Sequence, residues 1–100
     1  MNIRIMLVSD YEAVYDLWMS CAGMGLNDLD DSKEGISKFL QRNPETCFVA
    51  EINNRIVGSI LAGNDGRRGY IYHTAVHPEY RRQRIGSQLI TMAINALKRL

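Results

Sequence analysis

The sequence describes one small globular domain. It has 100 residues, 46% of them hydrophobic, with two prolines and no low-complexity run, which excludes a multidomain or disordered chain. Twelve Lys and Arg residues against eleven Asp and Glu residues leave a net charge of +1, so we expect neither nucleic acid nor membrane as a partner, and any anion site must be local. No apolar run approaches the roughly 18 residues of a membrane span, and we expect a cytoplasmic protein.

The two cysteines show no metal-ligand pattern. Cys21 and Cys47 lie far apart, each in an apolar segment. This placement predicts buried free thiols in a reducing compartment, in preference to a disulfide, and no metal site.

The first third of the chain predicts a strand followed by a helix. Residues 2–6 are apolar-rich, and Ser9 or Asp10 then offers a side-chain oxygen that can cap a helix. The glycines Gly23 and Gly25 are expected to end this helix. Its apolar residues recur at helical spacing: Val14, Leu17, Trp18 and Cys21.

A second helix follows the polar loop 27–31. Asp31 and Glu34 predict a start resembling a capping box. Asn43 before Pro44 is expected to stop the helix, because proline disfavours helical geometry in the preceding residue. The buried side of this helix should consist of Ile36, Phe39 and Leu40.

Three strands are predicted next. Residues 46–52 and 55–63 are β-prone and are joined by the two-residue turn of Asn53 and Asn54; the polar loop 64–69 then leads to a strand at 70–76. Strict alternation would divide the side chains of the strand 70–76 between the two faces of the sheet. One face would carry Tyr70, Tyr72, Thr74 and Val76, and the other would carry Ile71, His73 and Ala75.

The final segment reads as a helix and completes the element order. Its apolar residues repeat at helical spacing: Leu89, Met92, Ala93, Ala96, Leu97 and Leu100. The order β-α-α-β-β-β-α predicts an α+β fold, with a mixed, mainly antiparallel sheet and helices on both faces. A G-x-G-x-x-G sequence after the first strand is absent, which argues against a dinucleotide-binding unit.

The turn at 76–86, between the last strand and the last helix, carries the chemistry. Unpaired N–H groups at the start of the helix, the helix dipole and nearby arginines together attract an anion. Gly86 keeps side-chain atoms away from the backbone there. The alternative is a solvated basic turn without a ligand.

The residues of this turn resemble motif A of the GCN5-related N-acetyltransferases. The matching residues are Val76-x-Pro78-Glu79-Tyr80-Arg81 and then Arg81-x-x-Arg84-x-Gly86, against the family's Gln/Arg-x-x-Gly-x-Gly/Ala. Arg84 replaces the first glycine of that pattern, although an arginine still offers its amide if its backbone stays in a common region. The resemblance implies an acyl-CoA N-acyltransferase fold and acetyl-CoA contacts from Ala75, Val76, Arg81, Arg82, Gln83, Arg84, Ile85, Gly86 and Ser87.

The resemblance also implies direct transfer of an acetyl group from acetyl-CoA to an amine, with the Val76 amide, at the family's bulge in the fourth strand, near the acyl carbonyl. The family often places a glutamate, as the general base, near the start of this strand. By spacing, that position is Tyr70 here, whose phenol is a poor base at neutral pH. His73 is the better candidate base, because imidazole titrates near neutrality. The alternative for His73 is a packed residue bonded to a neighbour.

Two loops are further candidates for substrate contacts. Asp65, Arg67 and Arg68 bind a charged substrate or form a plain solvated turn. The residues between the two first helices occupy the family's substrate-side loop: Met24, Leu26, Asn27 and Asp28.

In the family the domain continues beyond the last helix with a strand, a helix carrying the usual tyrosine proton donor, and a further strand. Residues 1–100 are therefore expected to be a partial domain that is weakly active or inactive alone, and to form a homo-oligomer through the strand 70–76, the last helix, or both. The alternative function is a non-catalytic CoA-binding or scaffold module that self-associates. The sequence does not identify the amine acceptor.

Overall fold

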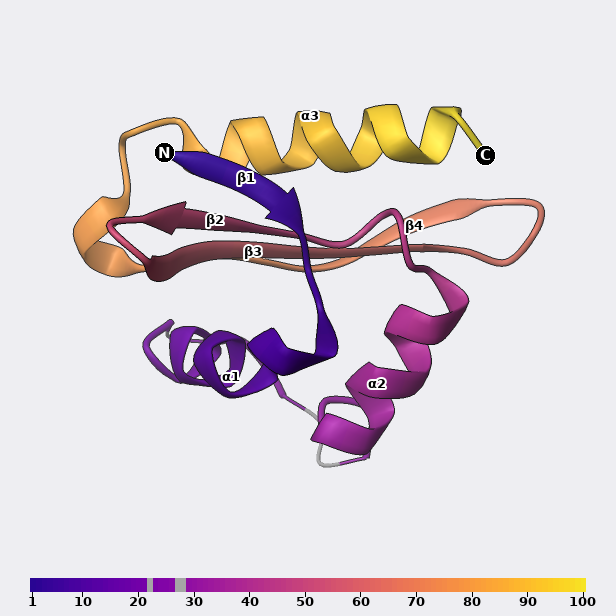
Figure 1. Cartoon of the computed structure of the whole chain (residues 1–100), viewed down its shortest axis with the longest axis horizontal. Helices are drawn as coiled ribbons and strands as arrows, with labels where there is room; N and C mark the ends of the chain where they lie inside the picture. The colour runs from indigo at the N-terminus through magenta and orange to yellow at the C-terminus, as the bar shows by residue number, and fades with distance from the viewer. Residues whose placement is uncertain (22, 27–28) are drawn as a thin grey trace.

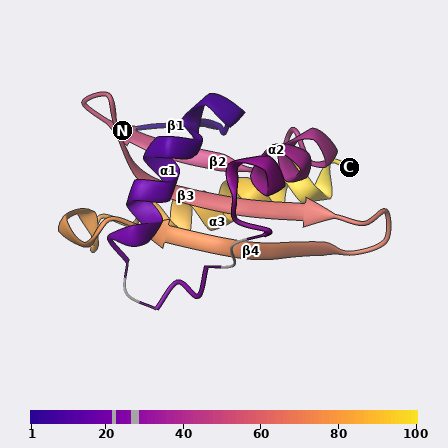
Figure 2. The same cartoon turned by 90° about the horizontal axis from the view of Figure 1, so that it is seen from below.

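The computed structural model describes residues 1–21, 23–26 and 29–100. A four-stranded sheet lies between helices, with α3 on one face and α1 and α2 on the other (Figure 1; Figure 2). The strands are β1 (Asn2–Ile5), β2 (Phe48–Ile52), β3 (Arg55–Asn64) and β4 (Gly69–Val76), in that spatial order, and all three described pairings are antiparallel. The helices are α1 (Tyr11–Met19), α2 (Lys33–Arg42) and α3 (Ile85–Lys98). The predicted fold class and element order are confirmed.

Two apolar cores fill the two faces of the sheet. Trp18 of α1 and Ile36 of α2 are buried on one face, and Leu89 of α3 is buried on the other. Gly58 of β3 faces α3, and a Cβ at this position would lie 2.9 Å from Cγ2 of Ile85. The glycine therefore allows α3 to lie close against the sheet.

The helix starts differ from the prediction in both places. No side-chain oxygen caps α1; instead, the Asp10 carboxylate accepts two hydrogen bonds of 2.8 Å from the Arg4 guanidinium and a third from the N–H of Leu7. The Arg4 bonds hold the pKa of Asp10 below its usual value. Ser32, and not Asp31, caps α2 by accepting the N–H of Gly35 at 3.0 Å.

A β-bulge interrupts β4. Ile60 is opposite Thr74 and Ala62 is opposite Ile71, so Tyr72 and His73 together face the single residue Leu61. As a result both rings lie on the face of α1 and α2, where Tyr72 contacts Phe39 of α2 and His73 contacts Trp18 of α1. The predicted strict alternation of residues 70–76 is therefore wrong across the bulge. The bulge that the family resemblance implied at Val76 lies instead at Tyr72 and His73, because Val76 is in register with Gly58.

The tight turns follow the prediction. Asn53 and Asn54 have φ values of 50° and 64°, as a two-residue hairpin turn requires. In the loop before β4, Oδ1 of Asp65 accepts the N–H groups of Arg67 and Arg68 at 2.9 and 2.8 Å. These bonds favour the interpretation of this loop as a structural turn.

Both cysteines are free and buried, as predicted. Burial raises the pKa of the Cys47 thiol to about 11. Among the described residues, no His, Cys, Asp and Glu side chains gather in a group of three that could hold a metal ion. None of the described helices is long and apolar enough to span a membrane.

Candidate active site

The turn between β4 and α3 is a short 3-10 helix, Pro78–Tyr80, followed by three arginines. Nδ1 of His77 accepts the N–H of Glu79 at 3.2 Å and caps the short helix. The guanidinium of Arg55 on β3 lies 5.8 Å from the centre of the Tyr80 ring. These contacts hold the turn against the sheet, so the start of α3 has a defined position.

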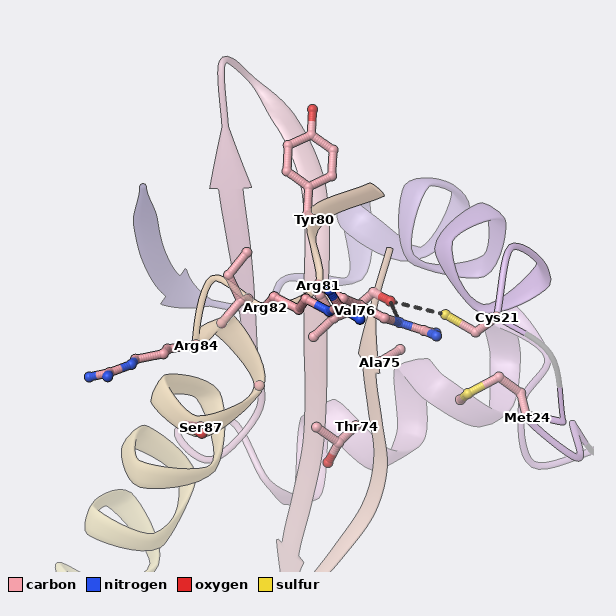
Figure 3. Close-up of a pocket in the computed structure, with 12 residues that line it drawn as sticks. Cys21, Met24, Thr74, Ala75, Val76, Tyr80, Arg81, Arg82, Arg84 and Ser87 are labelled. Atoms are coloured by element: carbon pink, nitrogen blue, oxygen red, sulfur yellow. Dashed lines mark hydrogen bonds between the residues drawn. The ribbon is translucent and has the colours of Figure 1, made fainter. Parts of the chain in front are cut away.

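Two arginines in this turn adopt backbone conformations typical of glycine. Arg82 has φ of 70°, and Arg84, the N-cap of α3, has φ of 61° and ψ of 19°. Arg84 therefore does not stay in a common backbone region, and the left-handed conformation costs a non-glycine residue about 1–2 kcal/mol. Its side chain points away from Val76 and Cys21 in Figure 3.

The first amides of α3 are free of helical partners. The first bond within the helix runs from the N–H of Gln88 to the carbonyl of Arg84, at 3.1 Å, so the preceding N–H groups project from the helix start. A Cβ on Gly86 would meet only Cγ2 of Val76, at 3.7 Å. Packing therefore does not require glycine here, and the open space beside it suits an approaching anion.

A hollow of about 590 Å³ lies beside these amides (Figure 3). The predicted CoA residues Ala75, Val76, Arg81, Arg82, Arg84, Ile85, Gly86 and Ser87 line it; Gln83 is exposed and is not among its lining residues. The hollow is also lined by Tyr80 of the motif and Met24 of the expected substrate-side loop, and by two residues that sequence reasoning missed as site residues, Cys21 and Thr74. Of these, only Thr74 had a signal, because it shares a face with Val76 two residues away.

Val76 presents its backbone to this hollow. The N–H of His77 donates to the carbonyl of Val57 at 2.8 Å, so the alternation of an antiparallel ladder turns the N–H and C=O of Val76 toward the free edge of β4. The Val76 carbonyl accepts Nε of Arg81 at 3.2 Å and the Cys21 thiol at 3.5 Å (Figure 3). The Val76 N–H points to the same edge.

A second hollow, of about 440 Å³, adjoins the other half of β4 and contains His73. Nε2 of His73 lies 2.8 Å from Oδ1 of Asp31, and the side chains are 20% and 8% exposed. The imidazole also meets the Trp18 ring edge-on, with 5.2 Å between ring centroids. Sequence reasoning missed Asp31 as a site residue because it assigned the carboxylate to a helix cap.

Tyr70 lies apart from both hollows. It is at the far end of β4, six residues from Val76, which is about 20 Å of strand. Its side chain is 41% exposed and contacts Tyr72. Of the predicted substrate-side loop, Met24 lines the first hollow, whereas Asn27 and Asp28 lie outside the described residues.

Comparison with known proteins identifies the family. The model of the acetyltransferase (GNAT) family matches residues 11–100. The chain belongs to this family. An acetyltransferase of Pectobacterium atrosepticum is 41% identical over 91 residues, which cover 91% of this chain and 63% of that protein. An acetyltransferase of Sodalis glossinidius is 38% identical with the same coverage. The chain thus spans less than two thirds of these GNAT relatives.

Solved GNAT structures share the fold. The PaiA N-acetyltransferase of Thermoplasma acidophilum, in complex with coenzyme A, superposes with a TM-score of 0.81 at 18% identity, over 98% of this chain and 72% of that one. The diaminobutyrate acetyltransferase of Paenibacillus lautus, in complex with its substrate and coenzyme A, superposes with a TM-score of 0.78 at 26% identity. This match covers 94% of this chain and 56% of that one. These likenesses show that the chain shares the fold of these proteins, and the family model confirms the resemblance that motif A indicated.

Proposed function

We propose that this chain binds acetyl-CoA at the start of α3 and supports transfer of its acetyl group to an amine. The observation that carries the proposal is the convergence of free helix amides, the small residue Gly86 and the cationic turn on one hollow. The pyrophosphate of acetyl-CoA is the part that suits this place, since it carries concentrated negative charge.

The edge of β4 supports the position of the rest of the donor. The pantetheine arm of CoA contains two amide groups, and the backbone groups of Val76 face the hollow as an unpaired strand would. An arm lying along this edge brings the thioester beside Val76, at the end of β4. The Val76 N–H then serves as a donor to the thioester oxygen, on which negative charge develops during transfer.

Residues around the hollow favour direct transfer over an acyl-enzyme. Cys21 is buried, and its thiol is engaged with the Val76 carbonyl. The role of base falls to His73 on the same strand, because Tyr70 lies at the far end of β4. In this proposal the amine attacks the thioester itself.

Calorimetric titration of the chain with CoA tests the proposal. We expect saturable binding in the micromolar range, weakened by salt because the pyrophosphate is bound through charge and dipoles. Absence of binding up to millimolar CoA would refute it. For acetyl transfer by the 100-residue chain alone we expect turnover below about 1 per second, and faster turnover would contradict this expectation.

Self-association of the chain is a second expectation. In the described part β4 pairs only with β3, and its apolar residues Ile71 and Tyr72 are 42% and 57% exposed. An edge strand of this kind, without lysine or proline, readily pairs with another copy. Light scattering after size exclusion should show a dimer or larger species, and a monomer throughout the micromolar range would contradict it.

A further inference from the structure

We propose that Asp31 and His73 form the base of the acceptor site, and that the hollow beside them takes a primary amine on a short apolar or aryl-alkyl chain without a carboxylate. Asp31 is the positioning residue and His73 the residue that takes the proton. The inference rests on the proposed function and names its acceptor class.

The contact with Asp31 fixes the tautomer of the imidazole. Nε2 of His73 lies 2.8 Å from Oδ1 of Asp31. An ionised carboxylate only accepts hydrogen bonds, so Nε2 must carry the hydrogen, and in the neutral ring Nδ1 then keeps its lone pair. Among the described residues no hydrogen-bond partner of Nδ1 is found. The pair therefore leaves one basic nitrogen for a substrate proton.

Both members of the pair are held in place. The hydroxyl of Tyr11 on α1 donates to the backbone carbonyl of Asp31 at 2.7 Å, and the Trp18 ring meets the imidazole edge-on. The Asp31 side chain is 8% exposed and that of His73 is 20% exposed. The imidazole is thus fixed on one side and open to the hollow that it lines.

The acceptor hollow lies next to the donor hollow. Along β4, Tyr72 and His73 line the acceptor hollow, whereas residues 74–76 line the donor hollow. The connection after α1 repeats this arrangement, because Met24 lines the donor hollow and Gly25 the acceptor hollow. His73 is three residues, or about 10 Å of strand, from the Val76 amide, a span that an imidazole and a bound amine can bridge.

The walls of the acceptor hollow define its ligand class. Asp30 and Asp31 contribute negative charge, which attracts an ammonium group and repels a carboxylate. Opposite them the Phe39 and Tyr72 rings meet edge-to-face at 5.4 Å, and Ile36 adds apolar surface. The two rings are in contact and form a continuous aromatic wall, and a carbon skeleton of aromatic size can pack against this wall within a volume of about 440 Å³.

The transfer step balances with these groups. The bound ammonium group first loses one proton to water. The lone pair of the neutral amine then forms the C–N bond to the acetyl carbon, and the C–S bond breaks with its electron pair remaining on the CoA sulfur. The proton leaves the nitrogen for Nδ1 of His73, while Nε2–H stays bonded to Asp31. The thiolate takes its proton from water.

Nitrogen NMR of the imidazole tests the positioning role directly. In the wild type we expect the His73 ring to carry its hydrogen on Nε2. Asp31→Asn should populate the Nδ1–H tautomer, because an amide NH₂ can donate to Nε2. Asp16→Asn removes a carboxylate from α1, outside this hollow, and should leave the tautomer unchanged. A wild-type Nδ1–H tautomer, or no response to Asp31→Asn, would overturn the proposal.

A matched pair of ligands tests the acceptor class. Phenethylamine should perturb the His73 resonances saturably in the presence of CoA, and phenylalanine, which adds only a carboxylate, should not. Where acetyl transfer is measurable, His73→Ala should lower it roughly 100-fold, and Asp31→Asn by less. Equal responses to both ligands, or none, would refute the acceptor assignment. CoA affinity, measured separately, should be the same in His73→Ala and Asp31→Asn as in the wild type. If the wild type did not bind CoA at all, that result would refute the proposed function and not the acceptor assignment.

Discussion

The two halves of β4 border hollows of different construction. Residues 74–76 border a hollow that offers backbone groups, at the strand edge and at the start of α3. Tyr72 and His73 border a hollow built from side chains, with Asp31 and Phe39 brought from distant parts of the chain. Backbone recognition suits a ligand part that is constant, whereas side-chain recognition suits one that varies.

The largest expected effect is the loss of CoA binding at one half of β4 while the other half is unchanged. Gly86→Glu should weaken CoA binding by roughly 100-fold or more, since a carboxylate then occupies the position proposed for phosphate. The His73 tautomer should not change. Calorimetry and imidazole NMR on the same sample measure both effects.

Gly86→Ala is the matched control, because its Cβ would meet only Cγ2 of Val76 at 3.7 Å. The fold should remain intact in thermal melts, with a smaller loss of affinity. Unchanged CoA affinity in Gly86→Glu would place the pyrophosphate elsewhere.

Two glycines of β3 permit a reciprocal test through packing. Gly58→Ala places a Cβ 2.9 Å from Ile85 of α3, and overpacking of this kind costs about 1–3 kcal/mol. Gly63→Ala places its Cβ 2.8 Å from the Phe39 ring on the opposite face. We expect Gly58→Ala to impair CoA binding and Gly63→Ala to impair the response to phenethylamine. Urea unfolding gives the stability change, and loss of both functions in either variant would show that the halves are coupled.

Asp10 offers a reference that touches neither half. Asp10→Asn removes the negative charge and one of the two oxygens that accept from the Arg4 guanidinium, and should reduce the free energy of unfolding by roughly 1–2 kcal/mol at pH 7. The pKa of Asp10 is lowered by Arg4, so this stability is present above the carboxyl's unfolded value near 4 and is lost as pH falls through the folded value. Urea curves from pH 7 to pH 2 should therefore converge for the two proteins. A constant difference at all pH values would contradict the assignment.

The smallest effect concerns the strained arginine of the donor half. Arg84→Gly should raise the free energy of unfolding by about 1 kcal/mol or less, because relief of the left-handed backbone outweighs the added flexibility of glycine. CoA affinity should be preserved or tightened. Arg81→Gly is the contrast: its φ of −69° and ψ of 160° are extended, so glycine relieves no strain there, and it removes the hydrogen bond to the Val76 carbonyl, so this variant should lose stability. A large loss of affinity in Arg84→Gly would show that its side chain holds phosphate.

The donor half was predictable from sequence because its parts are contiguous. The turn, the helix start and Gly86 occupy one segment, and helix geometry alone exposes the amides. Gln83 was included by position in the motif, but the turn leaves it outside the hollow. The backbone of Arg84 was not predictable, since nothing in its side chain indicates a positive φ.

The acceptor half was only partly predictable. His73 was identified by its chemistry, but its partner Asp31 lies 42 residues away and precedes a helix, where a carboxylate also makes a good cap. Ser32 caps the helix, so the Asp31 carboxylate is left to contact His73. The bulge that turns Tyr72 and His73 to one face leaves no signal in an otherwise alternating strand.

That bulge also divides β4 into two segments whose side chains are out of step by one residue. A substitution of Tyr72, within the bulge, alters the wall of the second hollow without changing which way residues 74–76 project. One hollow can therefore change its lining while the backbone that borders the other stays the same. An engineer seeking a new acceptor has a natural boundary within a single strand, with Tyr72 on the side open to redesign.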